Sequence, residues 1–119
     1  MTRIWSILLY ESITGEKPVE EFILSLTIKG QSKVARTFDH LEEFGPKLGA
    51  PHMKKLAGSH LWELRILGGD SIRIFYITTT GKTFLLLHGI TKKKQKTPRK
   101  EIDLAEKRLL EYTSRERIT

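Results

Sequence analysis

Two alternating segments, residues 61–67 and 71–77, limit the possible folds of this chain more than any other part of it. In each segment, apolar and polar side chains alternate with a period of two, which is typical of a β-strand with one buried face. The connection between them, Gly68-Gly69-Asp70, is short and rich in glycine. Such a connection between two alternating runs predicts a tight β-hairpin.

The register of this hairpin follows from its apolar residues. Three from each strand should share the buried face: Trp62, Leu64 and Ile66 from the first, and Ile72, Ile74 and Tyr76 from the second. They can do so only if residue 66 lies opposite residue 72, because a slip of one residue would expose one set. The same register places Arg65 opposite Arg73. Like charges opposed across a ladder cost a few tenths to about 1 kcal/mol. The two arginines are therefore either solvated side chains that splay apart or a fork for an anion such as a phosphate.

The chain before the hairpin predicts one strand and two helices. Residues 3–10 are apolar at both parities, so we expect a core strand covered on both faces. Pro18 suits the first turn of an amphipathic helix, which Lys29-Gly30 should break. A second helix is expected over residues 32–44, giving a helical hairpin. Residues 46–60, which hold Gly, Pro and Ser, are expected to form a loop.

After the hairpin, residues 83–90 predict a third, centrally placed strand of an antiparallel meander. A C-terminal helix should follow, with Thr97 as its N-cap and Pro98 in its first turn. The expected fold is α+β, with an N-terminal strand, a two-helix hairpin, a three-stranded antiparallel meander and a C-terminal helix. At 119 residues, we expect residues 1–119 to form a single domain.

Charge and composition favour a polyanionic partner. The chain has 21 Lys and Arg against 14 Asp and Glu, a formal net charge of +7. Nucleic acid is favoured over a membrane, because no apolar run approaches the roughly 20 residues of a span, and no signal peptide opens the chain. The absence of cysteine excludes disulfides and thiolate chemistry and fits the cytoplasm. The spacing of His52 and His60 matches no metal-ligand motif, so we expect neither a metal nor another cofactor.

Two basic segments flank the predicted meander. Lys54 and Lys55 precede it, where they serve either solubility or binding. The second segment follows the third strand and is held between that strand and the last helix, as expected of a phosphate-binding surface. Its lysines are Lys92, Lys93, Lys94 and Lys96. His88 could face either the arginines or the core, because the register of the third strand is not determined.

Several motifs resemble the RelE/HigB superfamily of bacterial toxins, and most closely its phage-derived HigB-like branch. They are Leu61-Trp62-Glu63-Leu64-Arg65, Arg73-Ile74-Phe75-Tyr76, Leu87-His88-Gly89-Ile90-Thr91-Lys92-Lys93 and Lys96-Thr97-Pro98 with Glu101-Ile102 and Ala105. The resemblance implies a RelE-like toxin that cleaves messenger RNA, usually on the ribosome. It also implies a co-encoded antitoxin, expected to be a helix-turn-helix protein of the HigA type.

Some residues match the functional positions of the superfamily, and others do not. Arg65 and Arg73 stand where basic residues line the RNA in the superfamily, and the lysines after the last strand correspond to Lys92 and Lys93. Glu63 departs from the pattern, because RelE-type enzymes tend to carry lysine there. Tyr112 lies too late in the chain to match the active tyrosine of RelE.

The implied reaction is metal-independent: the ribose 2′-hydroxyl attacks phosphorus and leaves a 2′,3′-cyclic phosphate. Arg65 and Arg73 would stabilise the developing charge, and Lys92 or Lys93 would neutralise the leaving oxygen. The general base that takes the proton from the 2′-hydroxyl would be Glu63 or His88. Lys54, Lys55, Lys94 and Lys96 would bind RNA. Two alternatives remain. One is a ParE-like inhibitor of DNA gyrase without hydrolysis. The other is a non-enzymatic RNA-binding module, but such modules usually offer several exposed aromatic residues for stacking, and Phe75 is the one aromatic residue expected on the arginine face.

Overall fold

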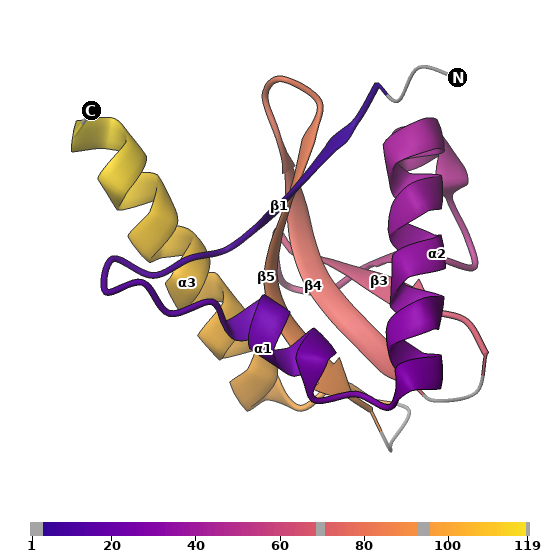
Figure 1. Ribbon diagram of the computed structural model, residues 1–119. Helices are drawn as coiled ribbons and strands as arrows, with labels where there is room; N and C mark the ends of the chain where they lie inside the picture. The colour runs from indigo at the N-terminus through magenta and orange to yellow at the C-terminus, as the bar shows by residue number, and fades with distance from the viewer. Residues whose placement is uncertain (1–3, 69–70, 93–95, 119) are drawn as a thin grey trace.

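The computed structural model describes residues 4–68, 71–92 and 96–118. In chain order the elements are β1 (Ser6–Leu9), α1 (Pro18–Leu24), α2 (Ile28–Phe44), the 3-10 helix η1 (Gly45–Leu48), β2 (Met53–Lys55), β3 (Trp62–Ile66), β4 (Ile72–Thr79), β5 (Thr83–Thr91) and α3 (Arg99–Ile118). The five strands form one mixed sheet in the order β1-β5-β4-β3-β2, in which only β1 runs parallel to its neighbour. The fold is therefore α+β, with the N-terminal strand and C-terminal helix that the sequence predicts (Figure 1).

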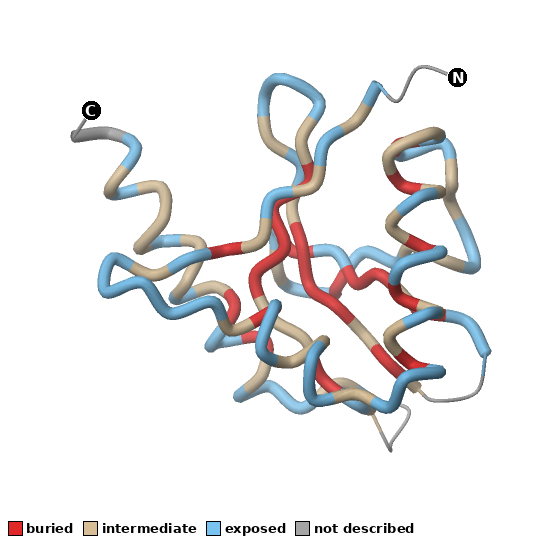
Figure 2. The backbone as a smooth tube through the Cα atoms, viewed as in Figure 1, coloured by how far each residue is buried: buried red, intermediate tan, exposed pale blue. Residues whose placement is uncertain are grey.

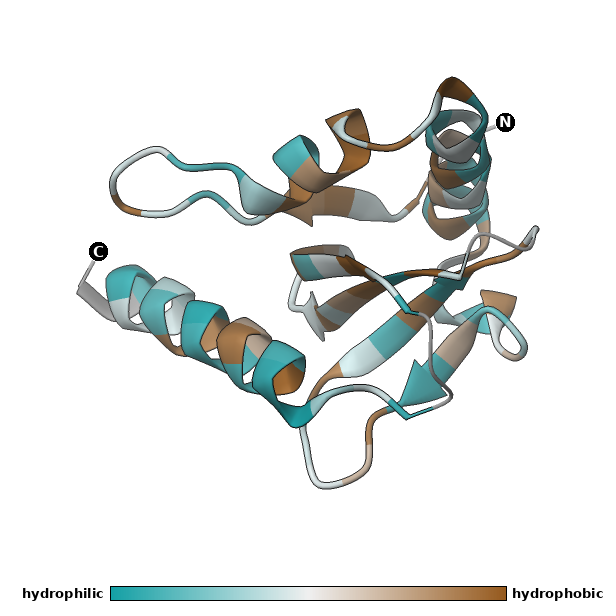
Figure 3. Ribbon diagram, turned by 90° about the horizontal axis from the view of Figure 1, so that it is seen from below, coloured by the Kyte–Doolittle hydropathy of each residue, from teal (hydrophilic) through white to brown (hydrophobic). Residues whose placement is uncertain are grey.

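The sheet separates two apolar cores. α1 and α2 cover one face, where Leu64, Ile74 and Phe84 are buried, and α3 covers the other, where Phe75 and Leu87 are buried. Figure 3 shows the sheet between these two helical layers. In Figure 2 the buried residues follow the inner strands β4 and β5. The prediction of an interior third strand is confirmed, since Phe84 to Leu87 are all 0% exposed.

The predicted hairpin register is confirmed. Ile66 pairs with Ile72, Leu64 with Ile74 and Trp62 with Tyr76, so Arg65 lies directly opposite Arg73. The alternation of apolar residues and the short connection together predicted this pairing, because a slip of one residue would move one apolar set off the buried face. The turn predicted at Gly68-Gly69-Asp70 lies partly outside the described residues.

The antiparallel part of the sheet has four strands, and the prediction of three is wrong. The additional strand is β2, in the segment expected to be a loop, and it pairs with β3 from Met53↔Leu64 to Lys55↔Trp62. β2 is only three residues long. Such a short edge strand is too brief to show a recognisable alternation among the surrounding Gly, Pro and Ser residues.

The N-terminal part differs from expectation in two further ways. β1 is an edge strand and not a core strand: its one neighbour is β5, and Leu8 is 42% exposed. The helix boundary lies at Thr27 and not at Lys29-Gly30, because the Thr27 side chain accepts a hydrogen bond from the Gly30 amide and caps α2. Figure 1 shows the seven-residue α1 at an angle to the long α2, so a short helix leads into a long one.

A β-bulge between β4 and β5 determines which side chains reach the arginine face. Thr79 pairs with Thr83 and Tyr76 with Leu86, but the register then shifts between Phe75 and Tyr76. Beyond the bulge, His88 pairs with Phe75 and Ile90 with Arg73. The extra residue thus reverses the alternation of β5 and turns His88 and Ile90 toward the arginines.

Candidate functional site

The face of the sheet that carries the arginines presents two rows of side chains across neighbouring strands. Lys54 pairs with Glu63 and Glu63 with Phe75, and His88 completes this row. Arg65 and Arg73 form the adjacent row. Because paired residues share a face, the register alone brings a carboxylate and several cations together.

Glu63 is the centre of this cluster. Its side chain is 1% exposed, and its Oε2 lies 3.4 Å from Nε of Arg65 and 3.8 Å from Nε of Arg73. Its Oε1 accepts a hydrogen bond of 3.2 Å from the Thr97 hydroxyl and lies 3.9 Å from Nζ of Lys92. Both carboxylate oxygens therefore face protein groups, and three cations surround one anion. A buried carboxylate is tolerated only with such compensation.

Arg65 and Arg73 use different atoms for their structural contacts. Among the described residues, Arg65 makes its side-chain hydrogen bond through Nε, to Glu63. Arg73 donates from Nη1 to the Ile72 carbonyl oxygen at 3.0 Å. Their side chains retain 30% and 20% exposure, respectively. Exposed guanidinium edges in this arrangement can bind the oxygens of a phosphate.

Lys92 extends the cluster beyond the end of β5. Its amide donates to the Ser71 carbonyl oxygen at 2.8 Å, which continues the pairing past the bulge. Burial lowers the pKa of the Lys92 ammonium group; Glu63 opposes this, and the positive charges of Arg73 and Lys54 lower the pKa further. A lysine with a lowered pKa in a cationic site can take part in proton transfer.

A pocket of about 200 Å³ opens beside Glu63 and Lys92. It is also lined by Lys54, Lys55, Leu56, Ala57, Lys96, Thr97 and Ile102. The two predicted basic segments therefore meet at one pocket. Lys93 and Lys94, predicted as a catalytic and an RNA-binding residue, lie outside the described residues.

Lys54 and Lys55 are not equivalent. Lys54 pairs with Glu63 and shares its face, whereas Lys55 pairs with Trp62 on the opposite face. The Lys55 ammonium group donates a hydrogen bond to the carbonyl oxygen of Ser59. The sequence predicted a shared role in RNA binding. Both residues line the pocket, but the Lys55 ammonium group is engaged by Ser59, which favours Lys54 for contact with a ligand.

His88 faces the arginine side of the sheet, which resolves the alternative left open by the sequence. Its Nδ1 lies 2.9 Å from Nη1 of Arg108, and its Nε2 lies 2.8 Å from Oε1 of Glu101. Because arginine can only donate, Nδ1 accepts and Nε2 carries the hydrogen that it donates to Glu101. Burial lowers the pKa of His88, and the hydrogen bond to Glu101 opposes that shift. His88 thus connects β5 to α3 through both ring nitrogens.

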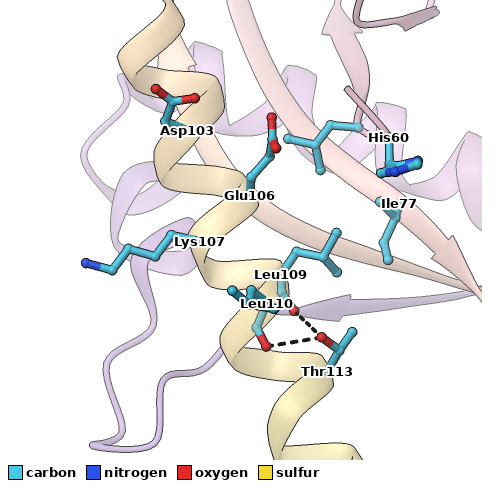
Figure 4. Close-up of a pocket in the computed structure, with 9 residues that line it drawn as sticks. His60, Ile77, Asp103, Glu106, Lys107, Leu109, Leu110 and Thr113 are labelled. Carbon is cyan, nitrogen blue, oxygen red and sulfur yellow. Dashed lines mark hydrogen bonds between the residues drawn. The ribbon is translucent and has the colours of Figure 1, made fainter. Parts of the chain in front are cut away.

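A larger groove of about 820 Å³ lies between α3 and the sheet (Figure 4). Apolar side chains line much of it, including Ile77, Leu109 and Leu110. Asp103 and Glu106 supply carboxylates at the same groove. Because two carboxylates disfavour a phosphate, the smaller basic pocket is the better candidate for a nucleic-acid site.

Three residues of this face were not assigned to the site from the sequence. Thr97 was expected to cap the last helix, but α3 begins at Arg99 and the Thr97 hydroxyl donates to Glu63. Glu101 and Arg108 hold His88. They lie seven positions apart on one face of α3, a spacing that could have indicated a shared polar contact with the sheet.

Within residues 4–68, 71–92 and 96–118, no group of three or more His, Asp or Glu side chains is placed to hold a metal ion. No described helix is both long and apolar enough to cross a membrane.

The fold and the pocket define a small basic α+β protein with a cationic cluster on one face of its sheet. The chain belongs to the family described as "Phage derived protein Gp49-like", whose profile matches residues 21–110. This is a HigB-like toxin family of the RelE superfamily, so the resemblance predicted from the sequence is confirmed. Membership of a toxin family implies a cognate antitoxin. A search of curated proteins found no match.

Proposed function

We propose that this chain is the toxin of a type II toxin-antitoxin system and that it cleaves messenger RNA on the ribosome without a metal. The observation that carries this proposal is the convergence of Lys54, Arg65, Arg73 and Lys92 around the buried Glu63 carboxylate. Glu63, Lys54 and Lys92 also line the small basic pocket. Four cations near one anion leave excess positive charge for a phosphodiester. Family membership supports the same activity, because RelE/HigB-like toxins are typically ribonucleases.

In the proposed reaction, the ribose 2′-hydroxyl gives up its proton to water and attacks the adjacent phosphorus, and the bond from phosphorus to the 5′-oxygen breaks. Arg65 and Arg73 bind the non-bridging oxygens as they gain negative charge. Lys92 donates a proton to the leaving 5′-oxygen, a role that suits a lysine whose pKa is lowered by burial. The products are a 2′,3′-cyclic phosphate and a 5′-hydroxyl.

Glu63 and His88, the two base candidates predicted from the sequence, both have their polar atoms engaged by neighbouring groups. We therefore assign the rate enhancement chiefly to charge stabilisation and to substrate positioning by the ribosome. Lys54 and Lys96 would bind flanking phosphates. Phe75 is fully buried and offers no stacking surface, which weighs against a module that binds single-stranded RNA by base stacking.

Expression without an antitoxin tests the proposal. We expect growth arrest with an early loss of protein synthesis in pulse labelling and shortened messages on RNA blots. The matched control is Arg73→Ala, which should allow growth and leave messages intact. If DNA synthesis stops first while translation and message length hold, the chain is a gyrase inhibitor and the proposal is wrong.

A further inference from the structure

Glu63 lies within 4 Å of three members of the cationic cluster, Arg65, Arg73 and Lys92. Arg65 lies two positions along the same strand, Arg73 lies on β4, and Lys92 follows β5. Thr97, just before α3, adds a hydrogen bond. One carboxylate thus connects groups from four parts of the chain, and it is 1% exposed.

The carboxylate offsets a repulsion within the cluster. Arg65 and Arg73 are opposed across the ladder, where like charges repel. Nε of Arg65 donates to Oε2 of Glu63 at 3.4 Å, and Nε of Arg73 lies 3.8 Å from the same oxygen, beyond hydrogen-bond distance. One negative charge therefore lies between the two guanidinium groups and offsets their repulsion. A planar guanidinium that donates from Nε has a restricted orientation at its terminal nitrogens, so Glu63 orients Arg65 directly. It attracts Arg73 by charge, while Nη1 of Arg73 donates to the Ile72 carbonyl oxygen.

The same contacts argue against a proton-transfer role for Glu63. A general base must come within hydrogen-bond distance of the proton that it removes. Oε1 of Glu63 instead faces Thr97 and Lys92, and Oε2 faces both arginines. A 2′-hydroxyl could reach either oxygen only by displacing these groups.

We propose that Glu63 is a positioning residue, a buried counterion that holds Arg65, Arg73 and Lys92 as a preformed array for a phosphate. The identity of that phosphate as RNA rests on the proposed function. Preorganised charges avoid the cost of reorganisation during the reaction. Glu63 therefore acts on the reaction through the cations and without touching the substrate.

The first test measures the pKa of Lys92 by NMR with lysine labelled at Cε, and it does not depend on RNA cleavage. Glu63→Gln should lower this pKa, because the carboxylate that favours the ammonium form is gone. Arg73→Ala should raise it, since a neighbouring positive charge is removed. Glu101→Gln is the matched control, because it changes the net charge equally. Glu101 contacts His88 and is not among the charges that shift the pKa of Lys92, so that pKa should not move. An unchanged Lys92 pKa in Glu63→Gln overturns the proposal.

The second test is a double-mutant cycle of single-turnover cleavage rates. Glu63→Gln should slow cleavage about 10- to 100-fold, as expected for misplaced catalytic groups, and should keep the shape of the pH profile. In the Arg73→Ala background the same change should add little, because the array is already broken. If the two losses multiply, or if Glu63→Gln removes a limb of the pH profile, Glu63 acts as the base and the proposal is wrong.

Two further results separate the possible failures. If the parent cleaves no RNA, the proposed function is wrong, and the Lys92 pKa still decides whether Glu63 organises the cations. If Glu63→Gln does not fold, Thr97→Val replaces it in the rate measurement, because it removes a donor to Oε1 and keeps every charge. A rate equal to the parent's in Thr97→Val then counts against the proposal, and a loss of several-fold supports it.

Discussion

Gly89→Ala should destabilise the protein because the backbone of β5 contacts an aromatic ring at this residue. A methyl group at Gly89 would lie 2.3 Å from Cδ2, 2.7 Å from Cε2 and 2.8 Å from Cγ of Phe22. These distances are far below van der Waals contact, so Phe22 and the short helix α1 must shift. Overpacking of this kind costs about 1 to 3 kcal/mol. Replacing a strand glycine recovers about 0.5 to 1 kcal/mol of that.

The net expectation is a loss of up to about 2.5 kcal/mol, which lowers the Tm of a chain this size by up to about 10 °C. Thermal unfolding followed by circular dichroism measures it. In a Phe22→Ala background, Gly89→Ala should be neutral or stabilising, because the ring that it meets is gone. A higher Tm for Gly89→Ala in the parent background would refute the packing of α1 on β5 described above.

Three further predictions concern the site. Arg73→Ala should reduce the rate of single-turnover cleavage by at least about 100-fold. It should cost only about 1 kcal/mol in the free energy of urea unfolding, because Glu63 keeps its other partners. A far larger loss of stability would show that Arg73 is chiefly structural. Because burial lowers the pKa of folded His88, the unfolded chain takes up its proton first, so stability should fall as the pH drops below about 6.5. His88→Asn should flatten urea-unfolding free energies over that range, and an unchanged pH dependence would contradict a neutral His88. Lys54→Gln should weaken binding of a single-stranded oligoribonucleotide and reduce the slope of log K against log salt by about 0.7. Lys55→Gln should change that slope less, because the Lys55 ammonium group donates to the Ser59 carbonyl oxygen. Equal effects of the two lysine changes in fluorescence anisotropy would contradict this difference between the two residues.

The sequence predicted the hairpin and its opposed arginines because strand alternation and turn length are local signals. It did not predict β2, whose three residues are too few to show a period. It also misplaced the start of α2. Gly30 was expected to break the helix, but it lies in the first turn, where its amide is satisfied by the Thr27 side chain.

The positions of His88 and Lys92 could not be predicted from the local sequence, for a different reason. A bulge at Phe75 and Tyr76 reverses the alternation of β5, and a bulge depends on the pairing of two strands and not on one strand's composition. The burial of Glu63 likewise requires Lys92 and Thr97 to close over it from distant parts of the chain. The sequence placed Glu63 on the arginine face but could not show that it is enclosed there.

The most direct test of the proposed chemistry is single-turnover cleavage of a message on translating ribosomes, with analysis of the new ends. The matched substrate carries a 2′-O-methyl group at the cleaved position, which removes the attacking hydroxyl and leaves the phosphate in place. We expect the parent protein to cut the unmodified message in the presence of a chelator, to leave a 2′,3′-cyclic phosphate and a 5′-hydroxyl, and to leave the methylated message intact. Cleavage of the methylated message, or products with 5′-phosphate ends, would contradict attack by the 2′-hydroxyl within this cationic pocket.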